Sequence, residues 1–433
     1  MTVLICWTSA LVTSALLIAI ALRARELFVK PSVVVVAVFH IVLQWPATLQ
    51  AASIVEYLPH PTTFFALAHI FPLAALVLTL ATARRGADAV FERLRTERPN
   101  HLSEPMPLVI LGLLAMALAA VYLSAVPLQQ TGLYSIVRDP FMANRARDES
   151  FKGLDSAAVR YAFALLATAV APLLSVLLWQ TAGNLWRARR YAGIVLIACA
   201  LVALLLVVSL PGSRVFPFLL VLTIAMAWAY QRGLPLNPLV LGAACTLALA
   251  GPTLLTLMRE GQRVTVGSFT SYLKIVLVER VLDGPIKPAL WYAHYAQTAG
   301  FFGVAGIPRL AELAGVPAAN VPNLIGLWYY DRATPTVHAD TAYVFSYYSY
   351  FGFRSLLVSI VLLLLLDVSI VLYRGLSHRM LTATVATVSV AALSFVSTDY
   401  TTVFLSHGFG TALLVALAVD YTARLFAREP ARG

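Results

Sequence analysis

Charged residues are scarce in this chain, and acidic residues are the scarcest of them. Asp, Glu, Lys and Arg together make up 12% of the 433 residues, with 20 acidic side chains against 31 basic ones. A soluble domain of this length carries roughly twice that charged fraction. Hydrophobic residues make up 60% of the chain, and the mean hydropathy is +0.82. The composition therefore predicts an integral membrane protein, and the net charge of +11 does not indicate a nucleic-acid partner.

Other absences narrow the chemistry. The three cysteines, Cys6, Cys199 and Cys245, lie in apolar runs too far apart for a metal motif or a disulfide framework. The sequence contains no Walker A motif, no His-Glu-x-x-His motif and no metal-type Asp-x-Asp pair in an outer loop. ATP hydrolysis and metalloprotease chemistry are therefore not expected. We expect neither a metal nor a cofactor.

Apolar runs long enough to cross roughly 30 Å of hydrocarbon recur along the chain and predict about eleven transmembrane helices. The first run follows no basic segment, so we expect a first membrane helix rather than a cleaved signal peptide. The expected fold is all-α and polytopic, with one integral membrane domain over residues 1–433. The runs cover residues 3–22, 32–53, 62–83, 106–127, 158–182, 192–211, 215–230, 236–258, 353–373, 380–398 and 403–423.

The basic residues of the short loops fall on alternate sides of these helices. Cytoplasmic loops normally hold the Lys and Arg of a membrane protein, so this side is predicted to be cytoplasmic. The N-terminus is then outside and the C-terminus inside. The basic clusters cover residues 23–30, 84–98, 187–190, 232, 374–379 and 424–432.

Two segments on the predicted outer side break this rule, because they are also basic. Residues 128–157 include Arg138, Arg145, Arg147 and Lys152, and residues 259–353 form a loop long enough for helices of its own. Within the second segment, residues 268–282 have the apolar spacing of an amphipathic helix at the membrane surface. Positive charge held outside at a topological cost suggests an anionic ligand. The basic residues from 259 to 354 are Arg259, Arg263, Lys274, Arg280, Lys287, Arg309, Arg332 and Arg354.

Arg214 lies in a very short outer turn between two predicted helices, in the stretch Leu210-Pro211-Gly212-Ser213-Arg214. A guanidinium at this place can form paired hydrogen bonds with pyrophosphate oxygens, and it stays charged at every physiological pH. The alternative is an arginine that anchors a helix end among lipid headgroups. Local pattern alone leaves both roles open.

Gly212-Ser213-Arg214 at the outer end of a helix resembles the Ser-Arg signature of the bacterial O-antigen polymerase and ligase superfamily. The layout is similar too, with one large periplasmic loop before the last few helices. The stretch from Ala339 to Phe353 resembles the point where that loop re-enters the membrane in repeat-unit polymerases. Several family members carry Gly-Arg followed by Trp in the loop, whereas this chain has Gly284-Pro-Ile-Lys287-Pro-Ala-Leu-Trp291. Either Lys287 replaces that arginine or Arg280 does its work.

The resemblance implies a GT-C-like, metal-independent, inverting glycosyltransferase of the bacterial inner membrane. Its substrate would be an oligosaccharide repeat unit on undecaprenyl pyrophosphate, polymerised into O-antigen or another surface polysaccharide at the periplasmic face. A chain-length-regulating co-polymerase and the membrane lipids are the implied partners. The cations expected to stabilise the leaving pyrophosphate are Arg214, Arg280, Arg259, Arg263, Lys287 and Arg354.

The reaction also needs a group that takes the proton of the acceptor hydroxyl. His338 is the first candidate, because histidine titrates near neutral pH and this one lies just before the helix that re-enters the membrane. Asp340 is the second candidate. Alternatively, Asp340 or Thr341 caps the helix that follows.

Tyr343, Tyr347 and Tyr350 repeat at i, i+4 and i+7, so a helix places the three rings on one face. They belong either to the aromatic belt at the membrane surface or, with Trp291, to a groove that stacks on sugar rings. Asp367, inside an apolar run, is expected to be paired and structural.

Two further functions stay open from the sequence. An O-antigen ligase would use the same donor and transfer the glycan to lipid A-core instead. A flippase or transporter for a lipid-linked glycan would be expected to carry charges within its spans and to show repeated halves. The nearly uncharged spans and the basic outer segments favour an enzyme.

Overall fold

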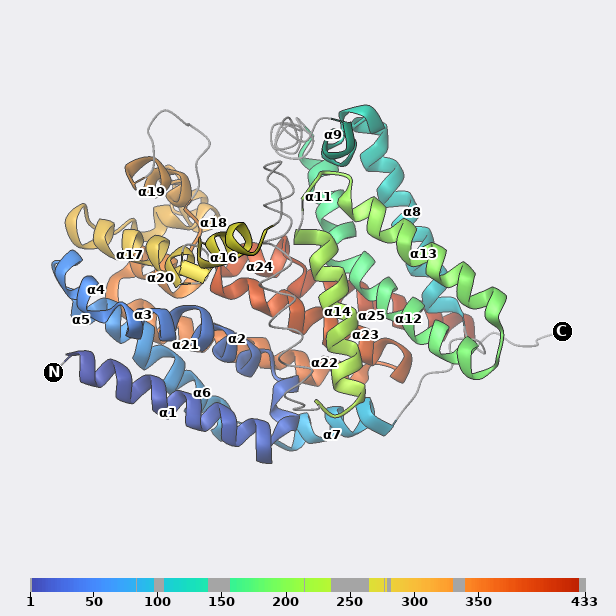
Figure 1. Ribbon diagram of the computed structural model, residues 1–433, viewed down its shortest axis with the longest axis horizontal. Helices are drawn as coiled ribbons and strands as arrows, with labels where there is room; N and C mark the ends of the chain where they lie inside the picture. The colour runs from blue at the N-terminus through green and yellow to red at the C-terminus, as the bar shows by residue number, and fades with distance from the viewer. Residues whose placement is uncertain are drawn as a thin grey trace. The chain divides into compact units, whose positions relative to one another are not determined.

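The computed structural model describes residues 2–82, 84–96, 105–138, 156–213, 215–234, 265–275, 277–278, 282–329 and 339–427 (Figure 1). All regular secondary structure in these ranges is helical. The all-α prediction is therefore confirmed for the described part of the chain.

Nine helices within the described ranges are long and apolar enough to cross a membrane, and each coincides with a predicted run. A tenth helix, α14 (Val215–Gln231), is apolar but shorter, and it matches the predicted run 215–230. The predicted run 236–258 lies outside the described residues. The nine helices are Thr2–Arg23, Pro31–Leu49, Pro61–Ala81, Met106–Ala125, Ala157–Arg187, Tyr191–Ser209, Tyr343–Gly375, His378–Val396 and Tyr400–Phe426.

The chain folds into two compact units that interleave along the sequence, which is why the sequence pattern shows no boundary between them. Unit 1 draws on residues 1–84, 236–368 and 393–400, and unit 2 on residues 85–235, 369–392 and 401–433.

Unit 1 has a core of apolar helices in which α2 is buried on all sides. Val33, Val35 and Val36 of α2 have no exposed surface, as expected for a helix that is hydrophobic all round. The helix from Pro31 continues through a π-helical segment, His40–Gln44, to Leu49. The α-helices of unit 1 are α1 (Thr2–Arg23), α2 (Pro31–Phe39), α3 (Trp45–Leu49), α4 (Ala51–Tyr57), α5 (Pro61–Phe65), α6 (Phe71–Ala81), α16 (Val266–Ile275), α17 (Asp283–Thr298), α18 (Pro308–Leu313), α19 (Val321–Tyr329), α20 (Tyr343–Phe351) and α21 (Ser355–Leu365).

Unit 2 is built around α23 (His378–Ala392), in which every residue from Met380 to Ala392 is buried. Its many Ala, Ser and Thr residues let neighbouring helices approach closely, and the Tyr230 and Ser389 hydroxyls share a 2.8 Å hydrogen bond between α14 and α23. The other helices of unit 2 are α7 (Arg84–Thr96), α8 (Met106–Ala125), α9 (Gly132–Arg138), α11 (Ala157–Leu165), α12 (Ala171–Arg187), α13 (Tyr191–Ser209), α22 (Ser369–Gly375), α24 (Tyr400–Leu405) and α25 (Phe409–Ala427).

The predicted outer segment 259–353 contains short helices, as its length and its prolines indicate. Pro308 occupies the first position of α18, where its missing N–H costs nothing. Pro288 lies inside α17 without ending that helix. The predicted surface helix over 268–282 begins at Val266 and is described as α16 up to Ile275.

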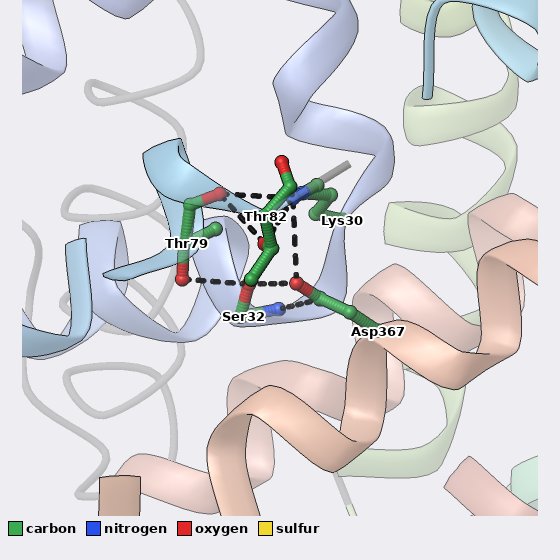
Figure 2. A network of polar contacts seen from close by, with 5 residues as sticks. All are labelled: Lys30, Ser32, Thr79, Thr82 and Asp367. Atoms are coloured by element: carbon green, nitrogen blue, oxygen red, sulfur yellow. Dashed lines mark hydrogen bonds and ion pairs between the residues drawn. The ribbon is translucent and has the colours of Figure 1, made fainter. Parts of the chain in front are cut away.

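A buried ion pair joins Lys30, the residue just before α2, to Asp367, two residues after α21 (Figure 2). Lys30 is 1% exposed and lies 3.8 Å from Asp367 Oδ2; its Nζ also donates to Thr79 O at 2.9 Å and to Thr82 Oγ1 at 2.8 Å. Ser32 donates its backbone N–H and its hydroxyl to the Asp367 carboxylate, at 3.1 and 2.7 Å. Asp367 is therefore paired, as predicted. Lys30 was counted among the basic residues of the predicted cytoplasmic loops; its side chain is not free in a loop but enclosed by the Thr79 and Thr82 oxygens.

Candidate functional site

A pocket of about 870 Å³ lies between α4 and α17, both of which belong to unit 1. Its size is within the range of pockets that enclose a small organic ligand. One wall comes directly after the apolar helix that ends at Leu49, so the pocket is next to the end of a candidate span. The lining residues are Gln50, Ser53, Ile54, Glu56 and Tyr57 on one wall and Asp283, Gly284, Lys287, Leu290 and Trp291 on the other.

Hydrogen bonds at both ends of α17 fix the two walls of this pocket against each other. The Gln50 side-chain amide donates to Leu282 O at 3.3 Å and to Asp283 Oδ1 at 3.2 Å. At the other end, the His60 backbone N–H donates to Gln297 Oε1 at 3.0 Å, and Gln297 Nε2 donates to His60 O at 3.1 Å. These bonds hold α17 where its pocket-facing side chains oppose α4.

Stacked aromatic rings form one side of the site. Trp291 and Tyr329 are parallel to within 8°, with ring centroids 5.5 Å apart. The Tyr329 hydroxyl is hydrogen-bonded to His294 Nδ1, and the His294 ring lies 5.3 Å from that of Tyr57. Burial raises the pKa of Tyr329, and partial burial raises the pKa of Tyr57, so both phenols stay neutral; Tyr57 is the one of the two that lines the pocket and can donate into it. A flat aromatic surface beside hydroxyl donors suits the apolar face and the hydroxyl groups of a sugar ring.

Glu56, Asp283 and Lys287 supply the charge of the pocket. Lys287 Nζ lies 3.2 Å from Asp283 Oδ2, one helical turn back on α17. Among the described lining residues, two carboxylates and one ammonium give a formal charge of −1. That balance suits a neutral hydroxylated ligand better than a pyrophosphate. The Asp283 carboxylate offsets the charge of Lys287. The role of Lys287 as a pyrophosphate ligand stays a prediction.

Glu56 has no ion pair with another described residue, and its side chain is exposed at the pocket. The sequence pattern did not single it out. The available signal was a carboxylate and a tyrosine placed directly after an apolar run, in Ala51-Ala-Ser-Ile-Val-Glu56-Tyr57. Carboxylates are rare in this chain, so one left uncommitted beside a pocket is available to accept a hydrogen bond or a proton.

The three predicted glycan tyrosines lie in the packed core of unit 1. As predicted, they share one face of a helix, with ring centroids 6.3 Å apart for Tyr343 and Tyr347 and 5.7 Å apart for Tyr347 and Tyr350. Each is at most 7% exposed. Tyr350 fills the space above Gly306, where a Cβ would come within 2.4 Å of its ring. A glycan-stacking role for these rings stays a prediction, and their burial argues against it. Trp291, the fourth predicted ring, is the one that lines the pocket.

The helix after Asp340 begins without a side-chain cap. Ala342 occupies the position before Tyr343, the first residue of α20, and makes no side-chain bond to the helix. The predicted cap by Asp340 or Thr341 is therefore wrong, because the helix begins one residue later than a Thr341 cap requires and two residues later than an Asp340 cap requires. Asp340 itself is exposed, close to the buried Tyr292 hydroxyl. Burial, together with the nearby charges of groups such as Asp340, raises the pKa of Tyr292 well above the ordinary value.

Four of the six predicted pyrophosphate-binding cations lie outside the described residues: Arg214, Arg259, Arg263 and Arg280. The predicted base His338 lies outside them as well. Arg354 is described, exposed and placed at the junction of α20 and α21. Within the described ranges, no group of three or more His, Cys, Asp and Glu side chains could hold a metal ion.

The turn that precedes Arg214 is tightly held within unit 2. Gly212 has a φ of 75°, and a Cβ on Gly132 would come within 2.2 Å of Pro211 O. The Leu133 N–H donates to Leu210 O at 3.0 Å. The Leu210–Ser213 turn is therefore fixed against the start of α9.

Comparisons with protein-family models, with curated protein sequences and with solved structures find no match for this chain.

Proposed function

We propose that this chain is a membrane-embedded glycosyltransferase that polymerises oligosaccharide repeat units carried on undecaprenyl pyrophosphate. The observation that carries the proposal is the α4–α17 pocket, in which Trp291, stacked on Tyr329 behind it, lies with two carboxylates, a lysine and the Tyr57 phenol among the described lining residues. This combination of flat rings and hydrogen-bonding groups suits a sugar, and the pocket follows the end of an apolar helix. A substrate with a lipid anchor and a glycan head requires that placement.

The proposed reaction joins two glycans by inverting transfer. An acceptor hydroxyl attacks the anomeric carbon of the donor sugar from the face opposite the pyrophosphate. The new glycosidic bond forms as the bond from carbon to pyrophosphate oxygen breaks, and lipid pyrophosphate leaves with the electron pair. The hydroxyl proton passes to a base, and cations stabilise the negative charge that develops on the leaving group.

Glu56 is the residue that we propose as the base, because its carboxylate borders the pocket and is uncommitted among the described residues. His338 and Asp340 are retained as alternatives from the sequence. For the leaving pyrophosphate we retain Arg354, a described cation of unit 1 at the junction of α20 and α21. Arg214 stays a prediction from the sequence. The described lining residues carry a formal charge of −1, which favours a sugar over the pyrophosphate as the occupant of this pocket.

The finer topology belongs to the same proposal. With α14 and the run 236–258 as spans, the chain crosses the inner membrane eleven times in a GT-C-like arrangement, with a periplasmic N-terminus and a cytoplasmic C-terminus. At 17 residues, α14 is at the lower limit for a membrane-spanning helix. A co-polymerase that sets chain length is the proposed protein partner.

The test is a reaction of the purified protein in detergent with a synthetic polyprenyl-pyrophosphate repeat unit, analysed on a gel. We expect a ladder of products from the wild type and a rate at least about a hundredfold lower for Glu56→Gln, the usual contribution of a general base. Glu312→Gln, which removes an exposed carboxylate of α18 away from the pocket, is the matched control and should keep the ladder.

Other outcomes separate the competing functions. Transfer to lipid A-core without a ladder would identify a ligase. Absence of both reactions would contradict an enzyme and favour a transporter of the lipid-linked glycan. An equal loss of polymerisation rate in Glu56→Gln and Glu312→Gln would show that Glu56 is not the base. The ladder made by the wild type would still support a polymerase.

A further inference from the structure

A second pocket, of about 210 Å³, lies within unit 2 and is rich in arginine. Three guanidinium groups border it, together with two half-buried indole rings and side-chain amides. Arginines at the cytoplasmic ends of membrane helices are common and usually point separately into solvent. Here they gather around one concave site. The guanidinium groups belong to Arg95, Arg187 and Arg232, the indole rings to Trp179 and Trp228, and one of the amides to Asn184.

The fold brings the three arginines together from distant parts of the sequence. Arg95 is in the last turn of α7, Arg187 is the last residue of α12, and Arg232 directly follows α14. The turn after α14 places Gly233, with a φ of 72°, beneath the Arg95 side chain, where a Cβ would lie 3.1 Å from Arg95 Nε. Figure 1 shows the end of α14 beside α7. These three segments belong to separate basic loops that were all predicted to lie on one side, and within unit 2 they meet. That this side is cytoplasmic stays a prediction.

The guanidinium groups of this pocket retain unused hydrogen-bonding capacity. Among the described residues, Arg95 pairs with Glu92 alone, at 3.0 Å, and both side chains are at least half exposed, so the pair contributes little. Arg187 bonds within its own helix, to Gly183 O and Asn184 Oδ1. Arg232 has no ion pair with any described residue. Three guanidiniums against the single Glu92 carboxylate leave a local charge of +2.

Other arginines of unit 2 show the contrast. Arg424 pairs with Asp420 and donates to Gly375 O, and Arg93 donates to the carbonyl oxygens of Arg374 and Leu376. These two side chains are engaged with the ends of neighbouring helices. The charge around the 210 Å³ pocket is not engaged in that way and is available to a ligand.

We propose that this pocket binds the phosphate of an anionic phospholipid headgroup. Guanidinium groups match phosphate oxygens with paired hydrogen bonds, and indole rings favour the depth of lipid headgroups. Basic pockets between membrane helices on the cytoplasmic side recognise anionic headgroups. The volume is too small for a nucleotide, whose sites are several hundred Å³, but fits a phosphate and its glycerol. The site is independent of the α4–α17 pocket and of the reaction proposed there.

The test measures lipid binding to the full-length protein in detergent by native mass spectrometry and by thermal shift. The probes are dioleoyl-phosphatidylglycerol, dioleoyl-phosphatidylcholine and inorganic phosphate. We expect retention of phosphatidylglycerol over phosphatidylcholine. Arg187→Gln and Arg232→Gln should each weaken phosphatidylglycerol binding about tenfold, the effect of one lost charge-assisted hydrogen bond.

Arg190→Gln is the matched control, because Arg190 is exposed on the same loop as Arg187 but does not line the pocket. Its phosphatidylglycerol binding should equal that of the wild type. Arg187→Lys keeps the charge without the guanidinium geometry and should fall between the wild type and Arg187→Gln. This variant also guards against a folding defect as the cause of lost binding.

Three results would overturn the proposal. Equal binding of phosphatidylcholine would remove the phosphate charge from recognition. An equal loss in Arg190→Gln would show attraction to the whole basic face instead of a pocket. Binding of inorganic phosphate without phosphatidylglycerol would assign the site to a soluble anion.

Discussion

Two groups of charged residues in unit 1 show how similar side chains serve different ends. The Lys30–Asp367 network and the Glu56–Asp283–Lys287 pocket each combine a lysine with carboxylate groups. In the network, Lys30 Nζ is surrounded by Thr79, Thr82 and Asp367 oxygens, and Ser32 satisfies the carboxylate (Figure 2). In the pocket, Glu56 is left without an ion pair among the described residues.

Both groups are charged and lie in an apolar chain, so charge alone does not separate a structural group from a functional one. What separates them is whether partners within the protein satisfy all the hydrogen bonds of the group. A buried charge with every partner in place stabilises one conformation and offers nothing to a ligand. An exposed carboxylate facing an open volume remains available. Substitutions in the Lys30–Asp367 network should therefore change stability, and substitutions in the pocket should change ligand binding.

Removing Lys30 should have the largest effect. Lys30→Ala leaves the Asp367 carboxylate buried and uncompensated, which costs about 3–5 kcal/mol of the free energy of unfolding. Chemical denaturation in detergent, followed by circular dichroism, measures that loss. The double variant Lys30→Met with Asp367→Leu should recover most of it, because two apolar side chains replace the pair. Recovery of no stability in the double variant would contradict the assignment of the network as a paired structural element.

The pocket side of the comparison is tested through Trp291. Trp291→Ala removes the ring that borders the pocket and stacks on Tyr329, and a stacked aromatic contact contributes on the order of 1 kcal/mol. We expect the affinity for the lipid-free oligosaccharide repeat unit to fall several-fold, measured by isothermal titration calorimetry. Trp328→Ala, in the same loop but outside the pocket, is the control. Equal affinities for the two variants would place the sugar elsewhere.

The sequence predicted the membrane helices well, because each is a continuous apolar run that length and composition alone reveal. It also predicted that Asp367 is paired, since a lone carboxylate in such a run is too costly. It did not predict the partner. Lys30 follows Arg23 and Arg25 at the end of a run and looks like one more loop cation, and only the approach of Thr79 and Thr82 encloses it.

The pocket was only half predicted for the same reason. Lys287 and Trp291 stood out because they lie in a basic, aromatic loop with a motif-like spacing. Glu56 and Tyr57, on the opposite wall, are more than 220 residues earlier and show no pattern that points to Asp283. The contact arises from how α17 docks on α3 and α4, which is a tertiary event that no local spacing encodes. Tyr343, Tyr347 and Tyr350 have the predicted helical spacing, but their face packs into the core, which local spacing does not reveal.

The smallest expected effect is on how the free energy of unfolding changes at alkaline pH, where the two groups act in opposite directions. Burial lowers the pKa of Lys30, so the unfolded chain holds that proton more tightly, and this group makes the free energy of unfolding rise as the pH increases towards about 10. Burial raises the pKa of Tyr57 and Tyr329, so these phenols ionise first in the unfolded chain, and they make the free energy of unfolding fall above about pH 10. Thermal unfolding midpoints recorded between about pH 8 and pH 11 measure both slopes.

Tyr329→Phe should make the alkaline decline shallower, whereas Lys30→Met should make it steeper, each relative to wild type. If the two variants shifted the slope in the same direction, the lysine and the tyrosines would share one environment, and the contrast between a closed network and an open pocket would fail.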